Sequence, residues 1–301
     1  MRRMLWIVMA LLLAGCSEGA GREGIVAETP AVTVGAATLA AADSATAATA
    51  TLALDAEPEA TAPVQPTVAA VADDAPTTAA EPGVTRVEEA LAFEGAEGLA
   101  IAATLYKPAG DGRFPGVILL HMLGSESDVW VQTGLVDALV GAGYAALAVD
   151  LRGHGATGGT ADWALAEQDV GLVWDAFAAR DDIDGQRTAA VGASIGANLA
   201  LRLGAARPGV RGLVLLSPGL DYRGVVTEDA IEGYGERPLL IVASGDDEYA
   251  ADSAASLNAW ALGDSEFGLY AEAGHGTDMF AKEPDLASLI VAWLDDHLAA
   301  Q

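Results

Sequence analysis

Hydrophobic and polar positions alternate in a regular order along the last two thirds of the chain. From Gly116 onward, short apolar runs recur, and between them lie segments with apolar residues at helical spacing. A continuous apolar run such as residues 116–120 is typical of a strand covered on both faces. The alternation of such strands with helices predicts an α/β fold, with a mostly parallel sheet and helices on both faces.

The same pattern gives approximate limits for each element. The predicted strands cover residues 87–93, 101–107, 116–120, 145–149, 188–191, 212–216, 238–243 and 267–270. The predicted helices cover residues 129–140, 163–179, 197–203, 227–234, 251–262 and 286–299. The first two strands are expected to form an antiparallel pair, joined by a turn at residues 94–98.

A serine lies at the junction between one of these strands and the next helix. Residues 192–196 read Gly-Ala-Ser-Ile-Gly, a G-x-S-x-G sequence with Ser194 at its centre. Flanking glycines leave room where a strand and a helix nearly touch, and so tight a turn exposes the serine hydroxyl. In a chain this rich in glycine and alanine, the pentapeptide can arise by chance. Whether Ser194 has a catalytic role therefore depends on which residues surround it.

Other chemically useful side chains follow neighbouring strands, where parallel sheets bind their ligands. These strand ends are His121-Met-Leu-Gly124, Asp150-Leu-Arg-Gly-His-Gly155, Ser244-Gly-Asp-Asp-Glu248 and Ala273-Gly-His-Gly-Thr277. A serine, a carboxylate and a histidine are therefore expected at one edge, in the chain order Ser194, Asp247, His275. That is the order used by enzymes whose nucleophile stands on a strand-to-helix turn.

Residues from about 87 to 297 resemble the α/β-hydrolase fold family, and most of all its dienelactone-hydrolase-like and small esterase branches. The resemblance implies an α/β-hydrolase fold and a serine hydrolase. Two positions depart from it. Many relatives have His-Gly where this chain has His121-Met122, and dienelactone hydrolases have a cysteine in place of Ser194.

The resemblance implies a role for each candidate residue. Ser194 is the predicted nucleophile and His275 the predicted base, which later acts as an acid. Asp247 is the preferred acid because relatives place it at the last position of a comparable strand end; Asp246 and Glu248 are the alternatives. The acid would fix the histidine tautomer.

Backbone amides complete the predicted site. The oxyanion hole is expected to use the amide of Ile195 and that of Leu123, with the amide of Met122 as the alternative. By the same resemblance, His121 and His154 shape loops, and His297 lies near the end of the last helix.

The predicted site has little to cover it. Only about twenty residues lie between Ser217 and the strand near Pro238, where many relatives insert a lid, so the lid should be minimal. The site is expected to be fairly open, flanked by Tyr222, Tyr234 and Met122.

The first residues have the pattern of an export signal. Two arginines precede an apolar run at residues 4–14, which is too short to span a bilayer. The run ends in Leu-Ala-Gly-Cys16, which resembles the lipobox of bacterial lipoproteins. That resemblance implies a signal peptide at residues 1–15 and a diacylglycerol on Cys16, which predicts an extracytoplasmic protein anchored to the cell envelope. An ordinary secretory signal is the alternative.

Composition divides the rest of the chain. Residues 16–85 are rich in Ala, Thr and Pro and nearly without aromatic or basic residues, which predicts a disordered linker; an Ala-rich helix is the alternative. Residues 86–301 form the predicted hydrolase domain. The formal net charge of −28 argues against binding to nucleic acid or anionic lipid. The single cysteine, Cys16, excludes an intramolecular disulfide.

The sequence thus predicts a serine hydrolase that cleaves carboxylic esters through an acyl-enzyme intermediate. No cofactor and no metal are expected, and the expected partners are a small ester or acyl substrate and, through Cys16, a membrane. A peptidase, thioesterase or acyltransferase with the same machinery is an alternative. So is a non-catalytic binding lipoprotein, since a fold does not fix a function.

Overall fold

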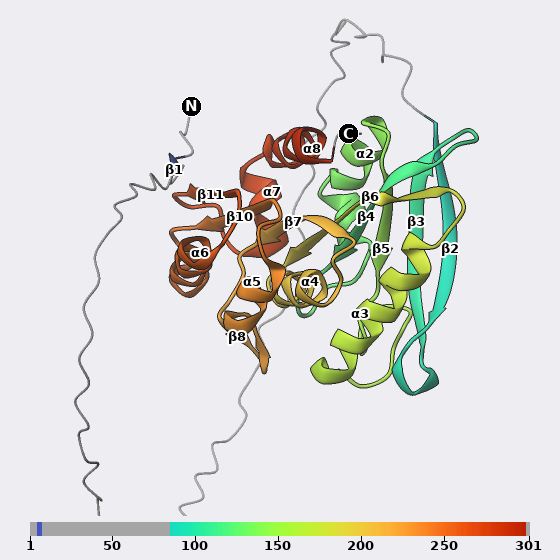
Figure 1. Ribbon diagram of the computed structural model, residues 1–301, viewed down its shortest axis with the longest axis horizontal. Helices are drawn as coiled ribbons and strands as arrows, with labels where there is room; N and C mark the ends of the chain where they lie inside the picture. The colour runs from blue at the N-terminus through green and yellow to red at the C-terminus, as the bar shows by residue number, and fades with distance from the viewer. Residues whose placement is uncertain (1–4, 8–84, 299–301) are drawn as a thin grey trace, which may run out of the picture. The chain divides into compact units, whose positions relative to one another are not determined.

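The computed structural model describes residues 5–7 and 85–298 of the chain. Residues 16–84, which include Cys16 and all but the last residue of the predicted linker, lie outside the described residues. Among the described residues, nine strands form one sheet in the order β1-β11-β10-β7-β6-β4-β5-β3-β2 (Figure 1). Their bounds are β1 (Leu5–Ile7), β2 (Arg86–Glu94), β3 (Ala100–Pro108), β4 (Phe114–Leu120), β5 (Ala145–Val149), β6 (Ile183–Ala193), β7 (Val210–Leu216), β10 (Leu239–Ser244) and β11 (Ser265–Tyr270).

The central strands run in one direction. Strands β5, β4, β6, β7, β10 and β11 pair in parallel, while β2, β3 and β1 pair antiparallel with their neighbours. The carboxyl ends of the six parallel strands therefore meet at one edge, as the sequence predicts. Strand β1, which pairs with β11, lies within the predicted signal segment.

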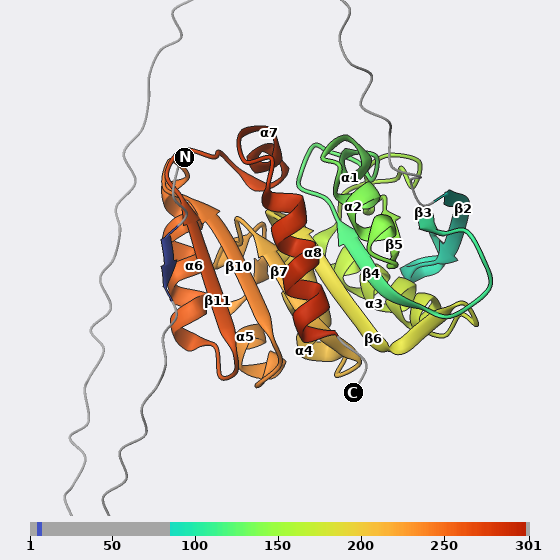
Figure 2. The same cartoon turned by 90° about the horizontal axis from the view of Figure 1, so that it is seen from above.

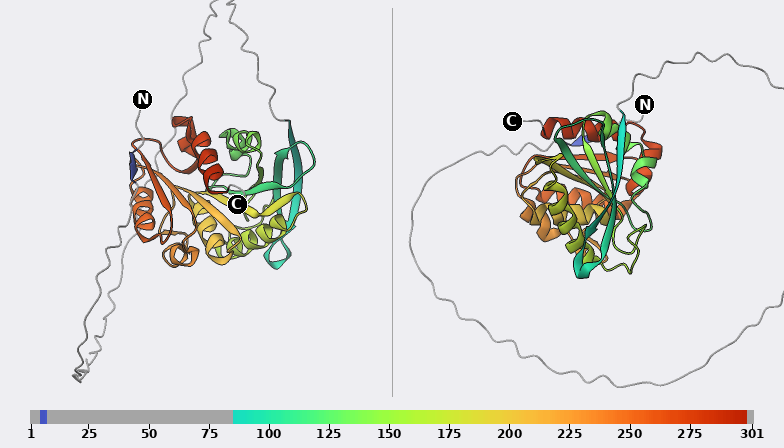
Figure 3. Two further views of the ribbon diagram at one scale, coloured as in Figure 1. Left: turned by 45° about the horizontal axis from the view of Figure 1, so that its top comes forward. Right: turned by 90° about the vertical axis from the view of Figure 1, so that its right-hand side faces the viewer.

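Helices cover both faces of the sheet, as Figures 2 and 3 show. One face carries α3 (Trp163–Ala178), α4 (Ile195–Ala206), α5 (Glu228–Tyr234) and α6 (Glu248–Trp260). The other carries α1 (Val129–Gln132), α2 (Leu135–Gly141), α7 (Met279–Lys282) and α8 (Leu286–His297). Alternate residues of β4 enter the two cores: Ile118 and Leu120 face the first, and Val117 and Leu119 the second. The predicted α/β-hydrolase fold class is confirmed.

One predicted helix is wrong. The segment 129–140 was expected to be continuous, but it forms α1 and α2, separated at Gly134. Gly134 has φ +76°, a left-handed conformation that glycine adopts freely and that interrupts a helix. Helix α6 begins at Glu248, three residues before its predicted start, so Asp247 takes the N-cap position.

The segment between β7 and β10 is short, and it folds without forming a separate lid domain. It contains the strands β8 (Asp221–Tyr222) and β9 (Val225–Val226), which pair as a hairpin, followed by α5. Arg223 and Gly224 both have positive φ, the geometry of a tight two-residue hairpin turn. Among the described residues, no helix is both long and apolar enough to cross a membrane.

Candidate active site

Ser194 stands on a sharp turn between β6 and α4. Strand β6 ends at Ala193 and α4 begins at Ile195, and Ser194 between them has φ 54° and ψ −120°. A residue with a side chain rarely adopts positive φ, so this backbone is strained. The turn is held by a hydrogen bond from the Ser194 amide to the Leu216 carbonyl on β7, at 2.8 Å. Ser194 is 6% exposed.

The two glycines of the motif allow the strand and helix to approach this closely. A Cβ at Gly192 would lie 2.1 Å from the carbonyl oxygen of Gly196. A Cβ at Gly196 would lie 2.2 Å from the carbonyl oxygen of Leu120. Neither position can hold a larger residue without a backbone shift, because both clashes are with main-chain atoms.

His275 and Asp247 lie together at the same edge of the sheet. The Oδ2 atom of Asp247 is 2.5 Å from Nδ1 of His275, a short hydrogen bond in which the carboxylate accepts. The side chain of His275 is 37% exposed and that of Asp247 is 19% exposed. With Nδ1 bonded to the carboxylate, Nε2 is the ring nitrogen left to exchange a proton with another group.

Asp246, the alternative acid, does not contact the imidazole but holds its loop. Its Oδ1 accepts hydrogen bonds from the Gly274 amide at 3.0 Å and from the hydroxyl of Ser244. These bonds lower the pKa of Asp246. The Ser244 hydroxyl in turn accepts from the Ala273 amide at 2.6 Å. The third candidate acid, Glu248, is exposed in the first turn of α6.

Another hydrogen bond holds the loop that carries His275 near Ser194. The amide of Gly276 donates to the hydroxyl of Ser217, a fully buried residue at the end of β7, at 2.9 Å. A Cβ at Gly276 would lie 3.5 Å from Cβ of Ala193, which immediately precedes Ser194. The residue after His275 therefore lies directly beside the residue before Ser194.

His121 shapes the loop that follows β4. Its Nε2 accepts a hydrogen bond from the Leu151 amide at 3.0 Å, so its Nδ1 carries the proton and donates to the Met122 carbonyl at 2.8 Å. The Met122 carbonyl also accepts from the Ser125 amide. Because a trans peptide directs its N–H away from its C=O, the Leu123 amide points to the side opposite these two donors.

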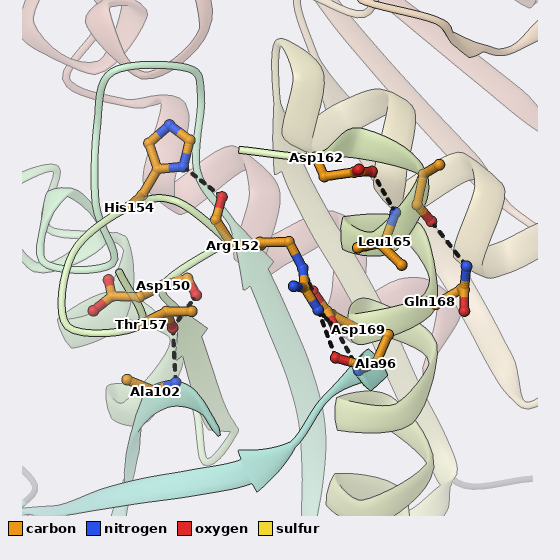
Figure 4. Close-up of polar contacts among 11 residues, drawn as sticks. Ala96, Ala102, Asp150, Arg152, His154, Thr157, Asp162, Leu165, Gln168 and Asp169 are labelled. Carbon is orange, nitrogen blue, oxygen red and sulfur yellow. Dashed lines mark hydrogen bonds and ion pairs between the residues drawn. The ribbon is translucent and has the colours of Figure 1, made fainter. Parts of the chain in front are cut away.

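The loop after β5 is held in place by several polar contacts (Figure 4). Arg152 and Asp169 form a buried, bidentate ion pair, with N–O distances of 2.7 and 2.9 Å, and both also bond the backbone of Ala96. The carboxylate of Asp150 accepts from the Ser127 amide at 2.7 Å, which ties the loop after β5 to the loop after β4. His154 bonds the carbonyl of Arg152, consistent with its predicted role in shaping a loop.

Two tyrosines were predicted to flank the site, and only one does. Tyr222, on β8, has its ring 6.2 Å from the His275 ring at 88°, and its hydroxyl donates to the Ser217 carbonyl at 3.4 Å. Tyr234 is 2% exposed, and its hydroxyl donates to the Pro238 carbonyl at 2.6 Å. The expectation for Tyr234 is wrong because its position on α5 directs it into the core.

Sequence reasoning missed several residues that position the site. Each of these residues accepts a hydrogen bond from a backbone amide that is distant in sequence, and no motif reveals such a bond. They are Ser217, Ser244 and Asn198. Ser217 and Ser244 do stand at carboxyl ends of predicted strands, which is the signal that could have identified them. Within the described residues, no group of three or more His, Cys, Asp and Glu side chains could hold a metal ion.

Comparison with known proteins bears on the fold of the chain. Residues 115–233 match the family model described as serine aminopeptidase, S33, a match that includes Ser194 but ends before Asp247 and His275. No curated protein matches the sequence at a significant level.

Several solved structures have the same fold at low sequence identity. A dienelactone hydrolase from Anabaena variabilis is 20% identical, with a TM-score of 0.58, covering 71% of this chain and 99% of its own. An acetyl xylan esterase from Paenibacillus sp. R4 is 17% identical, with a TM-score of 0.60, covering 75% and 87%. EstE1, a thermophilic carboxylesterase cloned from a metagenomic library, is 18% identical, with a TM-score of 0.59, covering 71% and 90%. These similarities show that the chain has the α/β-hydrolase fold.

Proposed function

We propose that this protein is a serine hydrolase that cleaves carboxylic esters through an acyl-enzyme formed on Ser194. Two observations together carry the proposal. Asp247 and His275 form a short hydrogen bond, and Gly276, the residue after His275, lies beside Ala193, the residue before Ser194. The esterases among the structural neighbours support the ester as substrate.

In the proposed reaction, His275 Nε2 takes the proton from Ser194 as its Oγ attacks the ester carbonyl. Asp247 holds the imidazole in the required tautomer and stabilises its charged form. The leaving alcohol then takes the proton from His275, and a water molecule repeats the sequence to release the acid.

The negative oxygen of the intermediate needs two donors. We assign one to the amide of Ile195, which has no partner inside α4 because it lies in the first turn. We assign the other to the amide of Leu123. Two hydrogen bonds fix the direction of the Met122 carbonyl, and the Leu123 N–H of the same peptide points in the opposite direction.

Hydrolysis of a panel of 4-nitrophenyl esters of increasing acyl length tests this function. Wild-type protein should show saturable hydrolysis, and Ser194→Ala should lower kcat on the order of 10⁴-fold or more. Ser256→Ala, which removes a half-buried serine on α6, is the matched control and should leave the rate unchanged. Equal rates for wild type and Ser194→Ala would reject the proposal.

A peptidase is the second candidate, because the matching family model is described as a serine aminopeptidase. Aminoacyl 4-nitroanilides, compared with esters of the same amino acids, distinguish the two. Preferential turnover of the anilides would favour the peptidase.

We also propose that the protein is exported and lipid-anchored through Cys16. The support is the segment from the paired arginines to Leu-Ala-Gly-Cys16. Metabolic labelling with a fatty acid should mark the wild type in the membrane fraction but not Cys16→Ala. Equal labelling of both proteins would contradict the anchor.

A further inference from the structure

The hydroxyl of Tyr222 lies against the reacting groups. The Tyr222 ring stands nearly perpendicular to the ring of His275, with 6.2 Å between centroids, and its hydroxyl is near enough to Asp247 and Ser194 for both to affect its pKa. Its other neighbour is the Ser217 carbonyl, at 3.4 Å, which is long for an O–H donor. The proton of this phenol is therefore weakly engaged and available to a better acceptor.

The hairpin that carries Tyr222 is anchored rather than loose. Asn198, fully buried one turn after Ser194 on α4, donates to the Val225 carbonyl at 2.7 Å and accepts from the Gly219 amide at 3.0 Å. The hydroxyl of Tyr249 bonds both the amide and the carbonyl of Asp221, at 3.0 and 2.9 Å. Both ends of the hairpin are thus fixed, and the phenol position is fixed with them.

Strand order determines on which side of Ser194 the phenol lies. Tyr222 follows β7, which lies between β6 and β10 and therefore on the side of the acid and base. The loop with Met122 and Leu123 follows β4, which lies on the other side of β6. The oxyanion of an intermediate would face the β4 side. The leaving group, which receives its proton from His275, would face the β7 side, where Tyr222 lies.

We propose that Tyr222 is a further catalytic residue whose hydroxyl donates a hydrogen bond to the leaving-group oxygen of the ester. The inference rests on the proposed function and deepens it. Burial, and then the charge of Asp247, raise the pKa of Tyr222 above its usual value, so the phenol remains a protonated donor at neutral pH.

The step balances without any further reactant. As the tetrahedral intermediate breaks down, the bond from carbon to the leaving oxygen breaks, and its electron pair stays on that oxygen. The proton on His275 Nε2 moves to the same oxygen, and the alcohol departs while the C=O bond re-forms. Tyr222 stabilises the negative charge that builds on the leaving oxygen, and it keeps its own proton throughout.

Leaving-group dependence tests this role. For acetates of 4-nitrophenol, phenol, trifluoroethanol and ethanol, kcat/KM reports the acylation step with a common acyl group. Tyr222→Phe should lose roughly ten- to hundredfold with ethyl acetate, since a hydrogen bond to developing charge is lost. It should lose less than about twofold with the 4-nitrophenyl ester, which needs little help to depart.

The result that would overturn the proposal is an equal loss, or no loss, for every ester in the series. Either outcome leaves Tyr222 with a packing role only. If wild type hydrolyses none of the esters and Ser194 does not react with a fluorophosphonate, the proposed function itself has failed, which is a different result.

Two further variants keep the test sound. Tyr144 immediately precedes β5, away from the carboxyl edge of the sheet, and its hydroxyl donates to Asp295. Tyr144→Phe removes this hydroxyl and should leave the leaving-group dependence unchanged. Gly219→Ala keeps the phenol but displaces it, because the new Cβ would lie 2.7 Å from Cε2 of Tyr222. Gly219→Ala should show the same selective loss as Tyr222→Phe. It replaces Tyr222→Phe in the test if Tyr222→Phe does not fold.

Discussion

Acid should destabilise this protein through His121, and His121→Gln should remove that part of the effect. The imidazole is fully buried, and its Nε2 accepts from the Leu151 amide. Protonation of Nε2 would place a second donor against that N–H. Only the neutral ring therefore fits the fold.

The size of the effect follows from the two states of the histidine. Burial lowers the pKa of His121 from 6.5 to about 4 in the folded protein. Between these values the unfolded chain binds a proton that the folded protein does not, so the free energy of unfolding falls as the pH falls. At about 1.4 kcal/mol per pH unit, about 3 kcal/mol is lost by pH 4, and the loss is complete about one pH unit lower. Above about pH 7, His121 adds no pH dependence, because it is neutral in both states.

Urea unfolding of wild type and His121→Gln, followed by circular dichroism from pH 8 to pH 4, measures this term. Both proteins have the same carboxylates, so the difference between them isolates the effect of His121. The stability advantage of wild type over the variant should shrink by about 3 kcal/mol across this range. A difference that stays constant from pH 8 to pH 4 would refute a buried, neutral His121.

Four further substitutions have expected outcomes. Gly196→Ala places a Cβ against a main-chain carbonyl, so it should abolish ester hydrolysis or prevent folding; wild-type activity would contradict the tight turn. Asp247→Asn should lower kcat about 10⁴-fold, whereas Asp246→Asn, which leaves the imidazole contact intact, should lower it far less; the reverse order would exchange their roles. Asp169→Ala strands Arg152 without its carboxylate and should cost about 3–5 kcal/mol in urea unfolding; a loss below 1 kcal/mol, roughly that of a surface pair, would contradict a buried ion pair.

The frame of the site could be predicted from the sequence because it depends on local patterns. Apolar runs identify the strands, and parallel strands bring their carboxyl ends to one edge. That rule alone gathers Ser194, Asp247 and His275. The tight Gly192–Gly196 turn has a sequence signature because its close backbone contacts exclude side chains.

The supporting contacts could not be predicted because they join segments that are distant in sequence. Ser217 holds a loop 59 residues later, and nothing near Ser217 reports this. Asp246 and Asp247 are neighbours with equal chemistry, and only the path of the loop after β11 gives them different partners. Tyr234 shows the same limit, since its helix was predicted but not the direction of its side chain.

Covalent labelling tests whether Ser194 is the nucleophile. After reaction with a fluorophosphonate, trypsin should release the peptide 188–202, in which Ser194 is the only serine. We expect a single adduct on this peptide, at Ser194, and none in protein unfolded before the reaction or in Ser194→Ala. An unmodified peptide from folded wild-type protein, or an adduct on another serine, would contradict it.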